Sequence, residues 1–320
     1  MTKTTETVFQ KYQIRKTKKQ KSAFIDYVKT IADENGYTCE IQKGLLGARN
    51  IVIGSPEKAK VLYTAHYDTC AVLPFPNFIT PKNFPLYLLY QIGILIPLFA
   101  LLLLLTPILL IPILLPLMFL SIDSIVISWV GGFLIEALLI GFCVLLIAGP
   151  ANRHTANDNT SGVTTLLDIM TEMPEELRGN AAFVFFDLEE SGLIGSMSFA
   201  NKYKKAVKNK PLINFDCVSD GDYILFAVKK TASRYAPLLN DAFRKDERVS
   251  VVDVCSKGVF YPSDQANFKN GIGVAALKRT KKGLLYMNRI HTPRDTVYRE
   301  ENIRFLTEGA IRLTENLTKE

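Results

Sequence analysis

The stretch FVFFDLEESG, residues 183–192, begins as a run of apolar residues and ends in two adjacent carboxylates, Glu189 and Glu190. Its apolar part is typical of a strand buried on both faces of a parallel sheet. Two carboxylates side by side repel each other, and this repulsion raises the pKa of one of them unless a positive charge offsets it. The stretch therefore predicts a core strand that ends at a functional site.

Strands of this kind alternate with helical segments through most of the 320 residues. The predicted strands are NIVIGS (50–55), KVLYTAHYDT (60–69), NAAFVFFDLEE (180–190) and PLINFDCV (211–218). The predicted helices are SGVTTLLDIMTEM (161–173) and SFANKYKKAVKN (198–209). This alternation indicates an α/β fold with a central, mostly parallel sheet, helices on both faces and ligands at the carboxyl ends of the strands.

A long apolar segment interrupts the alternation. No charged residue lies between Lys82 and Asp123, and Glu136 is the only charge in residues 125–148. Both stretches exceed the roughly 20 apolar residues that cross a bilayer as a helix, so we expect a transmembrane hairpin with spans at about 86–106 and 125–148. The alternative is a pair of buried core helices, which are usually shorter and interrupted by polar residues. The proline-rich stretch between the spans either extends the first helix or lies at the far interface.

The net charge of +7 comes partly from a basic cluster, RKTKKQK at residues 15–21. Such a cluster attracts anionic lipid headgroups or nucleic acid, or it forms the solvated face of a helix. Apolar residues recur at helical spacing just after it, at Phe24, Val28 and Ile31. We therefore expect the solvated face of a single helix, residues 9–36, and no nucleic-acid partner. The five cysteines are an odd number without a repeating spacing, which suits a reducing compartment rather than a disulfide framework.

Histidine and acidic side chains follow several of the predicted strands. In TAHYDT, His66 and Asp68 lie two residues apart, so both side chains point to the same side of an extended backbone. ANDNTSG opens a helix with Asp158, NFDCV carries Asp216 at a strand end, and a late loop, RIHTPRDT, contains His291. Taken singly, such an aspartate is more often a helix cap or a turn residue. Together, two histidines and several strand-end carboxylates are the ligand types of a pair of hydrolytic metal ions.

A metal pair also explains the two carboxylates of the first stretch. Adjacent residues on a strand point in different directions, so Glu190 can bind a metal ion while Glu189 faces the open side as a general base. The charge of the metal ions offsets the repulsion between the two acids.

The ordered motifs resemble those of a known enzyme family. TAHYDT, ANDNTSG, FFDLEESGLIGS, NFDCV, SDQANF and IHTPRDT are similar to the motifs of the di-zinc exopeptidases that include bacterial leucyl aminopeptidases, aminopeptidase Y and glutamate carboxypeptidase. The similarity covers residues 22–82 and 151–320. It implies a three-layer zinc-exopeptidase fold with a central mixed sheet, here interrupted by the transmembrane hairpin.

The resemblance also implies a site with two Zn²⁺ ions. His66 and Asp216 would hold one zinc ion. Glu190 and His291 would hold the second, and Asp158 would bridge the two zinc ions.

Further roles carry over at matching positions. Asp68 would orient His66, and Glu189 would deprotonate the metal-bound water and pass the proton to the leaving amine. In relatives the peptide bond at the bridging aspartate is often cis, so the Asp158–Asn159 bond is expected to be cis.

Two residues in or near SDQANF, Asp264 and Tyr261, are candidates for substrate or oxyanion contacts. Tyr261 as an ordinary packed aromatic side chain is the alternative. The family commonly has His where this chain has Gln265, so the usual role of that position does not carry over.

The insertion constrains the topology. We expect a peptidase domain in two parts, residues 1–82 and 151–320, with the transmembrane insertion at 83–150 between them. His66 and Asp158 meet at one metal ion, so the chain enters and leaves the bilayer on the same side and the number of crossings is even.

The flanks of the insertion carry Lys82 and Arg153, whereas the SIDS loop between the spans carries no basic residue. Positive charge favours the cytoplasmic side of a membrane. We therefore expect a two-span membrane protein whose catalytic domain is cytoplasmic.

The leading interpretation is a membrane-anchored di-zinc aminopeptidase that removes N-terminal residues from peptides through a metal-bound hydroxide. Carboxypeptidase or glutaminyl cyclase action of the same family is the enzymatic alternative, and cyclases typically work with one zinc ion. A catalytically inactive receptor or scaffold is the non-enzymatic alternative, against which the complete ligand set argues. The expected partners are a peptide substrate and the lipid bilayer, and the oligomeric state stays open.

Overall fold

The structure, a computed structural model, describes residues 1–120 and 122–319. Its strands are β1 (Cys39–Lys43), β2 (Arg49–Ile53), β3 (Val61–His66), β4 (Ala181–Phe186), β5 (Leu212–Phe215), β6 (Tyr223–Val228), β7 (Val251–Cys255), β8 (Gly271–Arg279) and β9 (Leu285–Tyr286). Its helices are α1 (Lys3–Lys11), α2 (Lys18–Glu34), α3 (Phe84–Phe119), α4 (Ser124–Ala148), α5 (Gly162–Glu172), α6 (Ile194–Lys202), α7 (Lys204–Val207), α8 (Ala236–Ala242) and α9 (Glu300–Lys319).

Two compact units divide the chain. The first, which we call the body, consists of Met1–Phe84 and the chain from Ala151 onward. The second, which we call the insertion, is the segment Pro85–Pro150.

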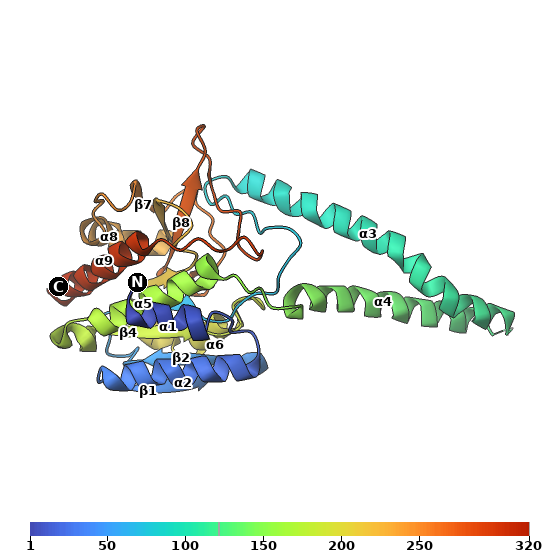
Figure 1. The fold of residues 1–320 in the computed structure, drawn as a ribbon, viewed down its shortest axis with the longest axis horizontal. Coiled ribbons are helices and arrows are strands. Elements are labelled where there is room, and N and C mark those ends of the chain that lie inside the picture. Colours follow the sequence, from blue (N-terminus) through green and yellow to red (C-terminus); the bar gives the residue numbers. More distant parts are fainter. Residues whose placement is uncertain (121, 320) are drawn as a thin grey trace. The chain divides into compact units, whose positions relative to one another are not determined.

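The strands of the body form one mixed sheet in the order β1-β2-β4-β3-β5-β8-β6-β7, with β9 paired to β8 (Figure 1). The four central strands β4, β3, β5 and β8 run parallel to one another. On one side β2 and β1 continue the sheet antiparallel, and on the other side β6 pairs antiparallel with β8. The parallel centre brings the carboxyl ends of neighbouring strands to one edge of the sheet.

Successive side chains of a strand point to opposite faces of the sheet. Because the central strands are mostly apolar, both faces are apolar, and helices cover both. Tyr63 and Phe183 belong to a core cluster shared with α2, α5 and α9. Leu62 and Val184 belong to a second cluster, shared with Phe199 of α6. All residues of β3 and β4 are buried, so both strands lie in the centre of the body. These layers confirm the predicted three-layer α/β fold.

The prediction of one helix over residues 9–36 is wrong. The helical conformation is interrupted between α1 and α2. The side chain of Thr17 then caps the second helix in a capping box with Gln20. Arg15, which lies in the break, is fully buried, and Lys21 at the start of α2 is buried as well. The basic cluster is therefore only partly solvated, because two of its side chains lie inside the body. The apolar face of α2 is buried as predicted.

The insertion contains α3 and α4, both long and apolar enough to cross a membrane. The proline-rich stretch extends the first helix, since α3 runs on through Pro97, Pro107, Pro112 and Pro116. At a rise of 1.5 Å per residue α3 is about 54 Å long, which exceeds the ~30 Å apolar core of a bilayer. Within the described part of the insertion, only Leu110 and Gly131 are buried.

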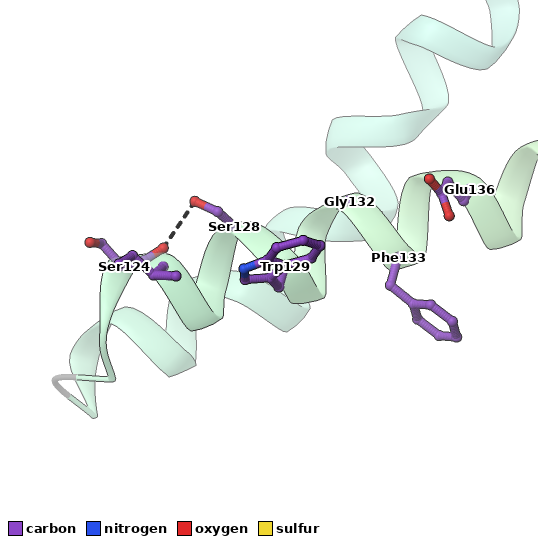
Figure 2. Close-up of a pocket in the computed structure, with 7 residues that line it drawn as sticks. Ser124, Ser128, Trp129, Gly132, Phe133 and Glu136 are labelled. Carbon is purple, nitrogen blue, oxygen red and sulfur yellow. Dashed lines mark hydrogen bonds between the residues drawn. The ribbon is translucent and has the colours of Figure 1, made fainter.

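One face of α4 carries small and polar residues at four-residue spacing, Ser124, Ser128, Gly132 and Glu136 (Figure 2). The hydroxyl of Ser128 donates a hydrogen bond of 2.9 Å to the backbone carbonyl of Ser124, so it is satisfied within its own helix. Glu136 is exposed in the structure and is the only charged residue of α4.

Candidate metal centre

Three neighbouring parallel strands bring several of the predicted site residues to one edge of the sheet. His66 is the last residue of β3, which pairs with β4 on one side and with β5 on the other. Glu189 and Glu190 follow the end of β4, and Asp216 follows the end of β5. A residue with a left-handed backbone, Leu188 with φ of 56°, turns the chain between β4 and the two glutamates. The parallel register therefore explains why residues far apart in sequence meet here.

The first half of the centre contains His66, Asp158 and Asp216. Nε2 of His66 lies 3.3 Å from Oδ1 of Asp158 and 3.5 Å from Oδ1 of Asp216. All three side chains are buried, and their ligand atoms lie within 4.8 Å of one another. This spacing suits a single metal ion bound by one imidazole and two carboxylates.

The second half contains Asp158, Glu190 and His291. Nε2 of His291 lies 3.0 Å from Oδ2 of Asp158 and 3.3 Å from Oε2 of Glu190. Asp158 therefore offers one oxygen to each histidine, which is the arrangement of a bridging carboxylate. The five residues that the resemblance names as metal ligands are brought together by the fold.

Cys70 joins the second half and was not predicted. Its Sγ lies within 4.8 Å of the ligand atoms of Asp158, Glu190 and His291. A signal for it was present in HYDTC, because Cys70 follows His66 and Asp68 at the same two-residue spacing.

Asp68 contacts His66 mainly through its backbone. Nδ1 of His66 lies 3.1 Å from the carbonyl oxygen of Asp68 and 3.6 Å from its carboxylate. The carboxylate accepts hydrogen bonds from the backbone N–H groups of Glu189, at 3.0 Å, and Glu190, at 3.3 Å. Asp68 thus ties the end of β3 to the glutamate pair, a contact that sequence reasoning did not anticipate.

The turn that carries Asp158 is held by the side chain of Asn159. Its Nδ2 donates to the carbonyl of Phe215 at 3.0 Å, and its Oδ1 accepts from the N–H of Gly162 at 3.0 Å. A Cβ on Gly162 would lie 2.3 Å from the Phe215 carbonyl oxygen, so only glycine fits where α5 approaches β5. The Asp158–Asn159 peptide bond is cis, as expected.

Two buried residues that support this turn were missed by sequence reasoning. The carboxylate of Asp295 accepts the N–H groups of Asn157, at 2.8 Å, and Asp158, at 2.9 Å. The guanidinium of Arg15 donates to the carbonyl of Tyr67 at 2.5 Å and lies near Asp158. Asp295 sits in the RIHTPRDT motif, so its proximity to the metal motifs was the available signal.

The cluster contains more carboxylates than imidazoles. Burial raises the pKa of Glu189 well above its usual range. Burial and the charge of Asp158 raise the pKa of Glu190 to about 8, against the attraction of His291. Burial opposes protonation of His66, but the charge of Glu189 and the contact with Asp158 outweigh it and raise the pKa of that imidazole.

The same balance holds in the second half. Burial opposes protonation of His291, yet Glu190 and Asp158 outweigh it and raise its pKa to about 9. Burial also opposes ionisation of Asp158, but contacts with His291 and His66 lower the pKa of this carboxyl. Oε1 of Glu190 and Oδ1 of Asp216 are buried without a hydrogen-bond partner. Buried, uncompensated oxygens beside two imidazoles fit divalent cations, whose charge would replace the protons on the histidines.

The two candidate substrate residues are both buried. The hydroxyl of Tyr261 donates to the backbone carbonyl of Asp216 at 2.9 Å, a contact that supports the end of β5. Burial raises the pKa of Asp264 to about 7. Gln265 bonds inside the body, with Nε2 donating to the carbonyl of Tyr261 and Oε1 accepting from Asn214.

Solved structures of low sequence identity share this fold. The LapA aminopeptidase of Legionella pneumophila has a TM-score of 0.56 and 15% identity, over 99% of this chain and 70% of that chain. A glutaminyl cyclase of Porphyromonas gingivalis has a TM-score of 0.54 and 16% identity, over 98% of both chains. A Zn-dependent exopeptidase of Parabacteroides distasonis has a TM-score of 0.54 and 15% identity, over 99% of this chain and 98% of that chain.

A comparison with curated proteins gave no match. The model of peptidase family M28 matches residues 142–307, just over half of the chain. This range includes Asp158, Glu190, Asp216 and His291. The match confirms the family resemblance of the ordered motifs, and the chain belongs to peptidase family M28.

Proposed function

We propose that the chain is a membrane-anchored di-zinc aminopeptidase. The observation that carries this proposal is a pair of ligand groups that share Asp158. One group adds His66 and Asp216, and the other adds Glu190 and His291. Imidazole and carboxylate are ligands that zinc takes in hydrolases. The similarity to a Zn-dependent exopeptidase supports zinc as the metal.

When bound, zinc ions would lower the pKa of water to about 7 and polarise the carbonyl of the peptide bond to be cleaved. The chain supplies the remaining chemistry. His66, Asp158 and Asp216 would hold one zinc ion. Asp158, Glu190 and His291 would hold the other.

Glu189 is the proposed general base. Its carboxylate lies within 4.8 Å of ligand atoms of His66 in the first half and Glu190 in the second half of the centre. It would accept a proton from the attacking water and deliver it to the nitrogen of the leaving amine, so one carboxylate serves both steps. Asp68 supports this role because its carboxylate holds the backbone of both glutamates.

Of the activities considered, aminopeptidase activity is the one we propose. Structures titled aminopeptidase and glutaminyl cyclase resemble this chain to the same degree, so the fold alone does not separate the two activities. The full set of five ligands together with Glu189 favours hydrolysis with two metal ions, because cyclases typically work with one zinc ion.

We also propose that residues 83–150 anchor the peptidase domain, whose parts are residues 1–82 and 151–320. Most side chains of α3 and α4 are exposed, whereas a pair of core helices would bury them in protein. Two crossings return the chain to the same side, and the basic flanks Lys82 and Arg153 favour a cytoplasmic peptidase domain.

The test is a panel of substrates with the detergent-purified full chain and its Glu189→Ala variant. The panel contains aminoacyl substrates with a free amine, the same substrates with a blocked amine, peptides for carboxypeptidase action, and a peptide with N-terminal glutamine. We expect the parent to cleave only free-amine substrates and the variant to bind zinc without turnover. Cyclisation of the glutamine peptide would support the cyclase instead, and activity indifferent to Glu189 would contradict the mechanism.

A further inference from the structure

Cys70 lies in the second half of the centre with no role in the chemistry described so far. It is 3% exposed, and its Sγ shares a ligand group with Asp158, Glu190 and His291. The side chain of Glu190 is 10% exposed, and its Oε1 has no hydrogen-bond partner. The thiol thus shares a ligand group with a carboxylate that has an unsatisfied oxygen.

The backbone fixes Cys70 relative to His291. The N–H of Leu73 donates to the carbonyl of His291 at 2.8 Å, and the N–H of Asn152 donates to the carbonyl of Cys70 at 3.2 Å. Nδ2 of Asn152 in turn donates to the carbonyl of Thr292 at 3.1 Å. The segment after β3 and the residue Asn152 therefore fix the backbone of Cys70 relative to the loop of His291. Two ligands of one metal ion need such a fixed relative position.

The other cysteines near the sheet differ from Cys70. Cys217 is also buried and follows Asp216 directly, yet its Sγ belongs to no ligand group among the described residues. Cys39 and Cys255 lie in β1 and β7, half-buried and away from the centre. A cysteine that is close to a metal ligand in sequence, as Cys217 is, therefore need not lie in the site, whereas Cys70 does.

We propose that Cys70 is a fourth protein ligand of the zinc ion held by Asp158, Glu190 and His291. The inference rests on the di-zinc function proposed above. Thiolate is a ligand that zinc takes readily, and the thiol releases its proton to water on binding. The two halves then differ in their ligands. The half with His66 offers only nitrogen and oxygen, whereas the half with His291 offers sulfur as well.

This difference assigns separate tasks to the halves. Zinc with four protein ligands is coordinatively filled, as in structural sites, whereas zinc with three protein ligands keeps a position open for catalysis. The half with His66, Asp158 and Asp216 has three such residues, and Glu189 groups with both His66 and Glu190. A zinc ion in the three-ligand half would therefore take the catalytic water, and Glu189 lies within 4.8 Å of the His66 ligand atom of that half.

The experiment is X-ray absorption at the zinc edge on the detergent-purified full chain, with zinc content measured on the same samples. A Zn–S distance is about 2.3 Å, against about 2.0–2.1 Å for nitrogen, so sulfur is resolved directly. We expect about one sulfur for every two zinc ions in the parent, no sulfur in Cys70→Ser, and unchanged sulfur in Cys217→Ser.

Two zinc ions with only nitrogen and oxygen neighbours in the parent would overturn the role of Cys70 while leaving the di-zinc proposal intact. Loss of the sulfur signal in Cys217→Ser but not in Cys70→Ser would also overturn it. Protein without zinc would instead contradict the proposed function. A parent spectrum without sulfur overturns the proposal however the variants fold, and the two variants decide which cysteine supplies the sulfur.

Retention of zinc gives a second readout. After equal dialysis against a weak chelator, we expect Cys70→Ser to keep about one zinc ion and Cys217→Ser to keep about two, because only the first loses a ligand. Equal retention by both variants would contradict the proposal.

Discussion

The body and the insertion use apolar side chains in opposite ways. In the body, every residue of β3 and β4 is buried among other parts of the same chain. In the described part of the insertion, two residues are buried, and large side chains such as Leu103 are exposed. An exposed apolar surface of this extent marks a site of contact with a membrane or another protein. The difference indicates that the body makes its own core, whereas the insertion leaves its apolar side chains exposed, as the proposed membrane anchor requires.

The two regions also treat charge differently. The body buries several carboxylates at the candidate metal centre, where imidazoles, backbone N–H groups and metal ions can compensate them. The insertion carries Glu136 on an exposed face of α4. This contrast fits the proposed division, with the chemistry in the body and the anchor in the insertion.

The largest expected effect is on the chemistry of the body. Glu189→Gln removes the proposed base but keeps the shape of the side chain, so turnover should fall roughly 100- to 10,000-fold. The measurement is kcat for a free-amine substrate, with zinc content determined on the same samples. Glu176→Gln, a change at an exposed position outside the centre, is the control and should keep the parent rate. Equal kcat values for the two variants would break the assignment of chemistry to Glu189.

A pair of core and surface substitutions compares the two regions directly. Phe183 is fully buried between the rings of Tyr37 and Tyr63, so Phe183→Ala should lower the free energy of unfolding by about 3–5 kcal/mol. Leu103 is 73% exposed, so Leu103→Ala should change the stability of the body by less than about 0.5 kcal/mol. Denaturant unfolding in detergent, followed by loss of activity, measures both. Similar losses would mean that the insertion contributes to the core.

Replacing residues 85–150 with a flexible Gly/Ser linker sharpens the comparison further. We expect the product to leave the membrane fraction and to hydrolyse a small soluble peptide at a rate close to that of the parent, because the proposed ligands all lie in the body. Sedimentation of cell extracts and kcat/KM check the two parts. A folded, zinc-loaded product without activity would show that the insertion takes part in catalysis.

The smallest effect is expected at Glu136. This carboxyl has no assigned role in hydrolysis, so Glu136→Gln should leave both membrane insertion and peptidase turnover close to those of the parent. Fractionation and kcat on purified protein are the measurements. Loss of turnover with normal insertion would mean that an intramembrane acid participates in the reaction.

Much of the fold could be predicted because its signals are local. β3, β4 and β5 are apolar runs, and the residues that end or follow them, such as His66 and Asp216, are the histidine and acids of the motifs. The break between α1 and α2 was also readable from Thr17 and Gln20, which have the spacing of a capping box, but the helical spacing of the apolar residues after it suggested one continuous helix.

The remaining parts of the centre depend on contacts between distant segments. Asp295 supports Asp158 through two backbone bonds, and Arg15 reaches the centre only because the chain turns inward after α1. The position of Cys70 depends on how the chain leaves β3 and meets the loop of His291. No period or spacing encodes such contacts, although Cys70 did continue the two-residue spacing of His66 and Asp68.

The central claim, two zinc ions that share Asp158, is tested most directly by metal content. The measurement is zinc per chain in the detergent-purified parent, in His66→Ala, in His291→Ala and in Cys255→Ser as a control. The account predicts about two zinc ions in the parent and the control, and about one in each histidine variant. A parent without zinc, or histidine variants that both keep two zinc ions, would contradict it.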